Sequence, residues 1–250
     1  MARQLIAETA NRRVYRDGDK AVKVFGKNTP NSEVLNEALI TVRIDETGGI
    51  RVPKILDVGV EKSGEWAITY EFIEGKTLQE LMDENPDRFD EYMEQMVDLQ
   101  LSIHARTCPL LNKLKDKMSR QILEIEDLEP ANRYDLRTRL DSMPKHTKLC
   151  HGDFCPENII VKDDGTMYVL DWIHATQGNA SADVARTYLL FCLKDQKKAD
   201  RYLELFCQKT NTDKRYVQSW LPLVAAAQLS KKRPEENELL HSWLDVVDYE

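Results

Sequence analysis

The pattern of apolar residues changes once along this chain, and the change restricts the folds that the chain can adopt. Up to about residue 72, apolar and polar residues alternate in short runs that predict strands, such as residues 20–25 and 55–60. One helix is predicted among them, because apolar residues recur at helical spacing from residue 34 to residue 42. After Gly75 helical spacing dominates, apart from three strand-like runs at residues 148–150, 158–161 and 167–170.

The order of these segments predicts an α+β fold with two lobes. We expect a small antiparallel β-sheet lobe at residues 1–73 and a larger, mainly helical lobe at residues 74–250. Asp17-Gly18 between two predicted strands is a hairpin signal, which favours antiparallel pairing. A chain of 250 residues is long enough for two modest cores, and a crevice between two lobes is a usual place for a ligand.

Composition narrows the range of partners. The formal net charge is −8, which weighs against a sequence-independent nucleic-acid binder, because such proteins need a basic face. No apolar run has the length of a signal peptide or of a membrane span. The five cysteines are scattered and odd in number, which is typical of a reducing compartment. We therefore expect a cytoplasmic protein that binds neither nucleic acid nor membrane, and the sequence does not indicate its oligomeric state.

The most informative motif is HGDFCPEN at residues 151–158, which is followed after a predicted hairpin by Asp171. Phosphoryl transfer needs a carboxylate near the acceptor hydroxyl and oxygen ligands for Mg²⁺. Asp153 suits the first task, and Asn158 and Asp171 suit the second. The alternative is a polar turn of capping residues without a joint role. The order of all three residues around predicted strands favours the catalytic interpretation.

A lysine in the N-terminal part supports the same chemistry. Lys23 lies within an apolar strand, and a lysine that faces a core or a cleft needs a partner. Glu37 on the following helix can supply the carboxylate, and Glu33, one helical turn earlier, is the alternative. A Lys–Glu pair that positions nucleotide phosphates is a feature of kinases.

These residues resemble the aminoglycoside phosphotransferase and choline kinase family of the protein-kinase-like superfamily, from Lys23 to Arg186. Gly152 stands where protein kinases carry arginine, and only 11 residues (172–182) separate Asp171 from Asp183, too few for a peptide-binding activation segment. The resemblance implies a kinase that phosphorylates a hydroxyl of a small molecule, with Mg²⁺ and with ATP as donor, GTP being the alternative.

The resemblance also implies residue roles. Asp153 is the expected catalytic base, and Asn158 and Asp171 are the expected metal ligands. Four residues are expected to bind the nucleotide, Lys23 and its partner Glu37 at the phosphates, and the main chain of Glu71 and Ile73 at the adenine.

Two further positions are less settled by the resemblance. Asp183 corresponds to an aspartate that braces the catalytic loop, although a simple charge at a helix N-terminus is the alternative. The first hairpin lacks glycine, so Arg12 and Arg13 are the candidates for charge near the phosphates, the alternative being solvated strand ends.

The acceptor is the least constrained part of the prediction. Residues 71–98 hold ten acidic side chains, and in the aminoglycoside-modifying relatives acidic residues bind ammonium groups, so an aminoglycoside-like, cationic acceptor is the first hypothesis. A choline, amino-alcohol or sugar kinase is the alternative, and Trp172, Trp220 and Trp243 are candidates for a quaternary-ammonium cage. A catalytically inactive nucleotide-binding regulator is a further alternative.

Overall fold

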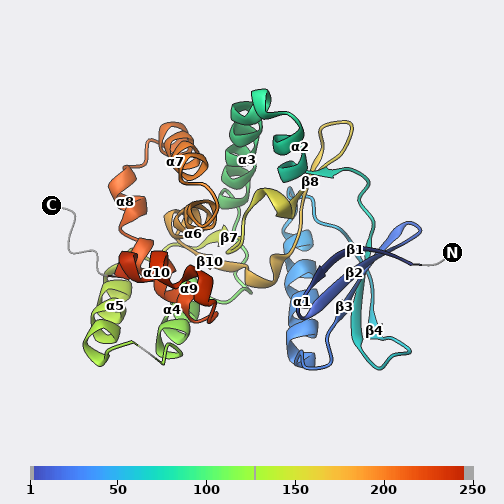
Figure 1. Ribbon diagram of the computed structural model, residues 1–250, viewed down its shortest axis with the longest axis horizontal. Coiled ribbons are helices and arrows are strands. Elements are labelled where there is room, and N and C mark those ends of the chain that lie inside the picture. Colours follow the sequence, from blue (N-terminus) through green and yellow to red (C-terminus); the bar gives the residue numbers. More distant parts are fainter. Residues whose placement is uncertain (1–2, 127, 245–250) are drawn as a thin grey trace. The chain divides into compact units, whose positions relative to one another are not determined.

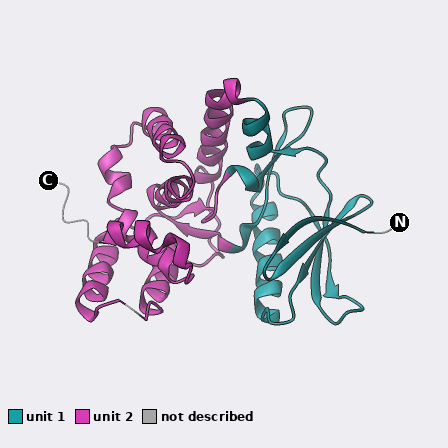
Figure 2. Cartoon of the chain, viewed as in Figure 1, with its two compact units in different colours: residues 1–85, 156–173 teal, residues 86–155, 174–250 magenta. Residues whose placement is uncertain are grey.

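The computed structural model describes residues 3–126 and 128–244, and Figure 1 shows its helices and strands. The chain divides into two compact units, which Figure 2 shows in different colours. We call residues 1–85 with 156–173 the sheet unit, and residues 86–155 with 174–250 the helical unit. Both units are therefore discontinuous in sequence.

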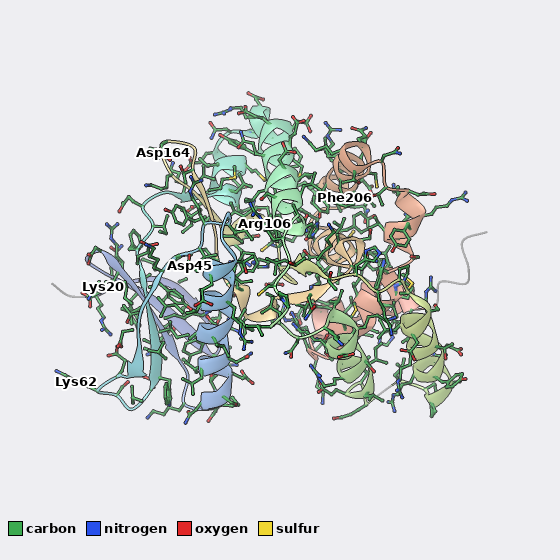
Figure 3. The ribbon with its side chains drawn as sticks, turned by 180° about the vertical axis from the view of Figure 1, so that it is seen from behind. Lys20, Asp45, Lys62, Arg106, Asp164 and Phe206 are labelled. Carbon is green, nitrogen blue, oxygen red and sulfur yellow. The ribbon has the colours of Figure 1, made fainter. Side chains whose placement is uncertain are left out.

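A five-stranded antiparallel sheet forms most of the sheet unit, in the order β1-β2-β3-β5-β4. Its elements are β1 (Gln4–Thr9), β2 (Arg12–Asp17), β3 (Lys20–Phe25), α1 (Asn31–Thr47), β4 (Ile55–Val60) and β5 (Trp66–Glu71). Phe25 packs against Val34 of α1, so α1 covers that face of the sheet. Because side chains alternate along a strand, Lys23 points to the same face as Phe25. The turn between β4 and β5 carries Lys62 at its tip (Figure 3).

A three-stranded sheet in the order β6-β8-β9 completes the sheet unit. Its elements are β6 (Lys76–Thr77), α2 (Leu78–Glu84), the 3-10 helix η2 (Pro156–Asn158), β8 (Ile159–Val161) and β9 (Met167–Val169). Gly75 lets the chain approach β8, because a Cβ atom there would collide with the carbonyl oxygen of Val161. The amide of Val169 donates to the carbonyl of Arg51, at 2.9 Å, and this bond joins β9 to the segment before β4.

Helices form most of the helical unit, and α3, α4 and α6 contact a short two-stranded sheet. They are α3 (Phe89–His104), α4 (Leu114–Leu123), α5 (Pro130–Ser142), α6 (Ala180–Cys192), α7 (Gln196–Thr210), α8 (Lys214–Gln218), α9 (Leu221–Leu229) and α10 (Asn237–Leu244), with short 3-10 helices η1 (Pro86–Arg88) and η4 (Pro234–Glu236). β7 (Lys148–Cys150) pairs with β10 (Thr176–Gly178) in the antiparallel sheet. The 3-10 helix η3 (Trp172–His174) spans the junction of the two units along the chain.

Two helices of the helical unit are buried over most of their surface. In α6, Val184, Ala185 and Leu189 are fully enclosed, and in α9 the same holds for Leu223 and Ala225. A helix that is apolar on all sides belongs in a core, which explains the position of α9. No helix within the described ranges 3–126 and 128–244 has the length and apolarity to cross a membrane.

The structure confirms the predicted α+β fold with an antiparallel sheet and a helical remainder. Helices and strands occur in every segment where sequence periodicity predicts them, with ends shifted by a few residues. The compact units divide the chain differently from the predicted boundary at residues 73/74, because β6 pairs with β8 and so joins residues 74–85 and 156–173 to the sheet unit.

Candidate active site

Lys23 forms a buried ion pair in the sheet unit. Its ammonium lies 2.5 Å from Oε1 of Glu37, and the two residues are only 9% and 2% exposed. The Tyr70 hydroxyl also donates to Oε1 of Glu37, at 3.1 Å. Burial, with the charge of Glu37, raises the pKa of Tyr70, which keeps its hydroxyl protonated as a donor. Glu33 is exposed, so the structure pairs Lys23 with Glu37 rather than with Glu33.

The same lysine contacts Asp171. Its ammonium donates to Oδ1 of Asp171 at 3.0 Å, and Nη1 of Arg12 lies 3.5 Å from Oδ2. Asp171 has a φ of 58°, a left-handed conformation that is uncommon outside glycine and is found where surrounding contacts hold it. Arg12, in the first hairpin, thus reaches the site, whereas Arg13 pairs with Glu65.

Asn158 lies beside Asp171 along the backbone. The carbonyl of Asn158 accepts the amide of Leu170, at 2.8 Å, because the two residues flank the paired strands β8 and β9. Carboxylate and amide oxygens are the donors that Mg²⁺ takes, together with waters and phosphate oxygens. Within residues 3–126 and 128–244 there is no group of three or more His, Cys, Asp or Glu side chains that could hold a metal by themselves. The amide of Asn158 and the carboxylate of Asp171 are oxygen donors of the kind that fits Mg²⁺.

The predicted adenine-binding segment follows β5. The amide of Glu71 already donates to the carbonyl of Lys54, at 2.9 Å, and the amide of Phe72 donates to Asp19. The amide of Glu71 is therefore committed to the sheet, which leaves its carbonyl as the group that could bind a ligand. Ile73 is buried, with 9% of its surface exposed.

Asp153 lies in the helical unit, in the loop after β7. Its Oδ1 is 3.3 Å from Nη2 of Arg186, and its amide donates to Nδ1 of His151. Burial favours the neutral acid, but the charges of Arg186, Lys231 and His151 outweigh this effect and hold the pKa of Asp153 below its ordinary value. The side chain is therefore a carboxylate at neutral pH.

Asp183 braces the loop that carries Asp153. Its carboxylate accepts the amides of Gly152, at 2.7 Å, and of His151, at 3.2 Å, and it also contacts Nε2 of His104 at 2.9 Å. These contacts support the bracing role over that of a simple helix charge. Gly152 has a φ of 79°, and a Cβ atom there would lie 2.5 Å from the carbonyl oxygen of His174, which is why glycine occupies the position.

The structure places a group of cations beside Asp153 that the sequence analysis does not predict as site residues. Lys117, Arg186 and Lys231 line one pocket of about 50 Å³ in the helical unit, together with Gly152. Arg186 enters the sequence prediction only as the end of the family resemblance. The two lysines give no signal, because neither stands in a motif and they are far apart in sequence.

The acidic residues and tryptophans that suggest a cationic acceptor contact other side chains of the protein. Six of the ten acidic residues in 71–98 form ion pairs with basic side chains, namely Glu74, Glu84, Asp90, Glu91, Glu94 and Asp98. Trp172 and Trp220 are buried, and Trp243 stacks on Tyr188 with ring centroids 6.0 Å apart. Each of these three rings is therefore already packed against other residues of the protein.

A family comparison identifies the chain once this geometry is known. The model of the phosphotransferase enzyme family matches residues 2–223. The chain belongs to the phosphotransferase enzyme family. This assignment confirms the resemblance from which the site residues are predicted, and it supports a phosphotransferase that acts on a small molecule. No protein of curated function matches this phosphotransferase by sequence.

Solved structures show the fold of this phosphotransferase. The apo form of a thermostable mutant of aminoglycoside phosphotransferase APH(4)-Ia matches with a TM-score of 0.71 and 15% identity, over 98% of this chain and 91% of that chain. A GDP complex of a mutant aminoglycoside 2'-phosphotransferase-IIIa matches with a TM-score of 0.65 and 17% identity, over 97% and 91%. A choline/ethanolamine kinase family protein from Mesorhizobium loti matches with a TM-score of 0.63 and 14% identity, over 98% and 89%. The fold is therefore the protein-kinase-like fold of these enzymes.

Proposed function

We propose that this chain transfers the γ-phosphoryl group of ATP to a hydroxyl of a small molecule, in a reaction that depends on Mg²⁺. The observation that carries the proposal is the buried ammonium of Lys23, which Glu37 and Asp171 share at 2.5 Å and 3.0 Å. Burying a lysine with two carboxylates carries a desolvation cost. A role of this lysine in orienting nucleotide phosphates explains why the protein buries it.

The nucleotide is assigned to residues of the sheet unit. Lys23 would contact the phosphates, and Glu37 would keep its ammonium in place through the 2.5 Å ion pair. The carbonyl of Glu71 and the main chain of Ile73 would hydrogen-bond the adenine. Solved structures of APH(4)-Ia with ADP or AMP-PNP and of the 2'-phosphotransferase with GDP support nucleotide binding in this fold, and ATP is our proposal for this chain.

The metal is assigned to Asn158 and Asp171. When bound, Mg²⁺ would neutralise phosphate charge and help to align the γ-phosphoryl group. The ordinary oxygen chemistry of this residue pair fits such an ion. Arg12, 3.5 Å from the Asp171 carboxylate, would add positive charge from the glycine-free hairpin.

Asp153 is the proposed general base. Its lowered pKa keeps it ionised, so that it can orient the acceptor hydroxyl and accept its proton. The hydroxyl oxygen then bonds to the γ-phosphorus, the bond to the bridging oxygen breaks, and ADP leaves. Asp183 would act as a positioning residue, since it holds the amides of His151 and Gly152.

A screen of alcohols by coupled ADP release tests the proposal, with Asp153→Asn as the decisive variant. We expect at least a ~100-fold loss of kcat in Asp153→Asn, with nucleotide affinity nearly unchanged, because the base acts on the acceptor. Asp163→Asn, an exposed carboxylate in the β8–β9 turn, is the matched control and should keep wild-type turnover. Nucleotide binding without turnover of any alcohol would instead favour the regulator hypothesis.

A further inference from the structure

The pocket beside Asp153 has a composition that the proposed reaction does not by itself explain. Its walls come from α4, α6 and the region from α9 to residue 231, all within the helical unit. The lining includes apolar side chains such as Leu114 and Val224. Its charged side chains are three cations, Lys117, Arg186 and Lys231, and one carboxylate, Asp183. A substrate pocket next to a catalytic base is expected to match the charge of the substrate.

The three cations differ in the hydrogen bonds and ion pairs that they form. Arg186 lies 3.3 Å from Asp153 through Nη2 and donates to Oε1 of Gln228 through Nη1, at 2.6 Å. The Lys117 ammonium donates to the carbonyl of His174, at 3.0 Å, which leaves two of its protons for other acceptors. No hydrogen bond or ion pair joins the Lys231 ammonium to a residue of the ranges 3–126 and 128–244.

Burial and mutual repulsion both disfavour the charged forms of these lysines. Burial comes first and the charge of Arg186 second in lowering the pKa of Lys117 and of Lys231, each to about 8. Both lysines therefore still carry their charge at neutral pH. Positive charges crowded in a partly dry pocket are unfavourable unless an anion joins them.

The nearby carboxylates do not balance this charge. Asp183 is occupied by the amides of His151 and Gly152 and by His104. Glu236 pairs with Arg233 and accepts a hydrogen bond from Gln228. Asp183 lines the pocket and Asp153 is contacted by Arg186, so these two carboxylates are fewer than the three cations.

We propose that the acceptor carries an anionic group, a carboxylate or a phosphate, which binds Lys117, Arg186 and Lys231 while its hydroxyl meets Asp153. This inference rests on the proposed function and specifies its substrate class. A pocket of about 50 Å³ accommodates one small oxyanion rather than a ring system. A polycationic acceptor would meet like charge at three positions, which is strongly unfavourable.

The contact between Arg186 and Asp153 links specificity to chemistry. Arg186 lines the pocket, and its guanidinium also contacts Oδ1 of Asp153. An oxyanion bound to Arg186 would therefore lie close to Asp153, the proposed general base. The anionic group would thereby orient the acceptor as well as bind it. We therefore regard the three cations as specificity-determining residues.

Titration calorimetry with sodium sulfate tests the pocket directly, at constant ionic strength and with saturating Mg²⁺ and AMP-PNP to fill the nucleotide phosphate subsites. We expect the Kd for sulfate to increase at least tenfold in Lys231→Gln and in Lys117→Gln. Lys113→Gln, an exposed lysine one helical turn before Lys117, is the matched control and should bind like the wild type. Equal sulfate binding by the wild type and both pocket variants, or none in the wild type, would overturn the inference.

The acceptor screen separates this inference from the proposed function. Glycerate and glycerol 3-phosphate, each compared with glycerol, and kanamycin as a polycation belong in the panel. We expect every alcohol that is phosphorylated to carry an anionic group. We also expect Lys231→Gln to raise the KM for that alcohol at least tenfold, with less effect on kcat.

Turnover of neutral or cationic alcohols alone would leave the proposed function intact and refute the anionic acceptor. An effect of Lys231→Gln confined to the KM for ATP would refute it equally. If no alcohol is turned over, the proposed function fails, while the sulfate titration still decides whether the pocket binds anions.

Discussion

Among individual residues, Lys117 and Lys231 beside Asp153 have pKa values that burial lowers. The pKa of Lys231 falls from an ordinary value of 10.5 to about 8, through burial first and the charge of Arg186 second. Asp153 opposes this shift, and Arg233 and Lys117 add to it. Between pH 8 and about 10.5 the unfolded chain holds a proton that the folded chain has released. The free energy of unfolding should therefore rise through this range, and the full cost of the buried charge remains below pH 8.

Replacing Lys231 by methionine should remove this pH dependence. We expect the free energy of unfolding of Lys231→Met to exceed that of the wild type by more at pH 7 than at pH 10, with a difference between the two pH values on the order of 2 kcal/mol. Urea unfolding at the two pH values measures it. Lys113→Met, whose lysine is exposed, should show the same difference from the wild type at both pH values. A pH-independent difference for Lys231→Met would show that Lys231 titrates normally.

At the scale of elements, the loop after β7 depends on its glycine. Gly152 has a φ of 79°, and a methyl group there would lie 2.5 Å from the carbonyl of His174. Gly165, in the turn between β8 and β9, has the same φ of 79°, but nothing lies within 4 Å of its added Cβ. The two glycines therefore share the backbone strain and differ in the collision.

Gly152→Ala should destabilise the chain more than Gly165→Ala. The strain of a left-handed alanine costs on the order of 1 kcal/mol in both variants, and the collision should add a further ~1–3 kcal/mol in Gly152→Ala. Urea midpoints give the difference, and kcat should fall in Gly152→Ala because Gly152 adjoins Asp153. Equal urea midpoints for the two variants would mean that the loop relaxes away from His174.

The long elements are predictable from the sequence because each shows its own period. Local periodicity predicts both the helix α1 and the strand β3, and the need of a buried lysine for a carboxylate pairs Lys23 with this helix. The choice of Glu37 over Glu33 depends on how α1 packs on the sheet. Strands β6 and β10 show no such period, because they have only two and three residues and exist through partners far along the chain.

The candidate site also has a part that the sequence predicts and a part that it does not. Asp153, Asn158 and Asp171 lie in a compact motif, so residue type and spacing indicate their chemistry. The pocket cations are brought together by the packing of α4, α6 and the end of α9, and no local pattern indicates such a meeting. The acidic stretch at residues 71–98 favours a cationic acceptor only as long as its ion-pair partners are unknown.

At the scale of the whole molecule, ligand binding should appear as stability. A ligand that binds only the folded state adds about 2.7 kcal/mol at a hundredfold excess over its Kd. For a chain of this length that amounts to several degrees in Tm. The proposed function makes Mg²⁺ with AMP-PNP such a ligand, with Asp171 as one of its anchors.

Asp171→Ala should therefore lose most of the nucleotide-induced increase in Tm. The loss follows from removal of a proposed metal ligand and of a contact 3.0 Å from Lys23. Thermal unfolding with and without Mg²⁺ and AMP-PNP measures it. Asp163→Ala, which changes an exposed aspartate in the turn between β8 and β9, should keep the wild-type increase. An undiminished increase in Asp171→Ala would remove Asp171 from the nucleotide site.

The discontinuity of the sheet unit has a consequence for how this chain is made. When residue 85 leaves the ribosome, β6 has emerged, but β8, its partner, is still to be translated. The helices α3, α4 and α5 must come out first, so the N-terminal part of the protein is completed only after much of the C-terminal part has begun to form. A fragment that ends at Asn85 would lack β8, the strand that pairs with β6. We expect this fragment to be less stable than one that extends through residue 173.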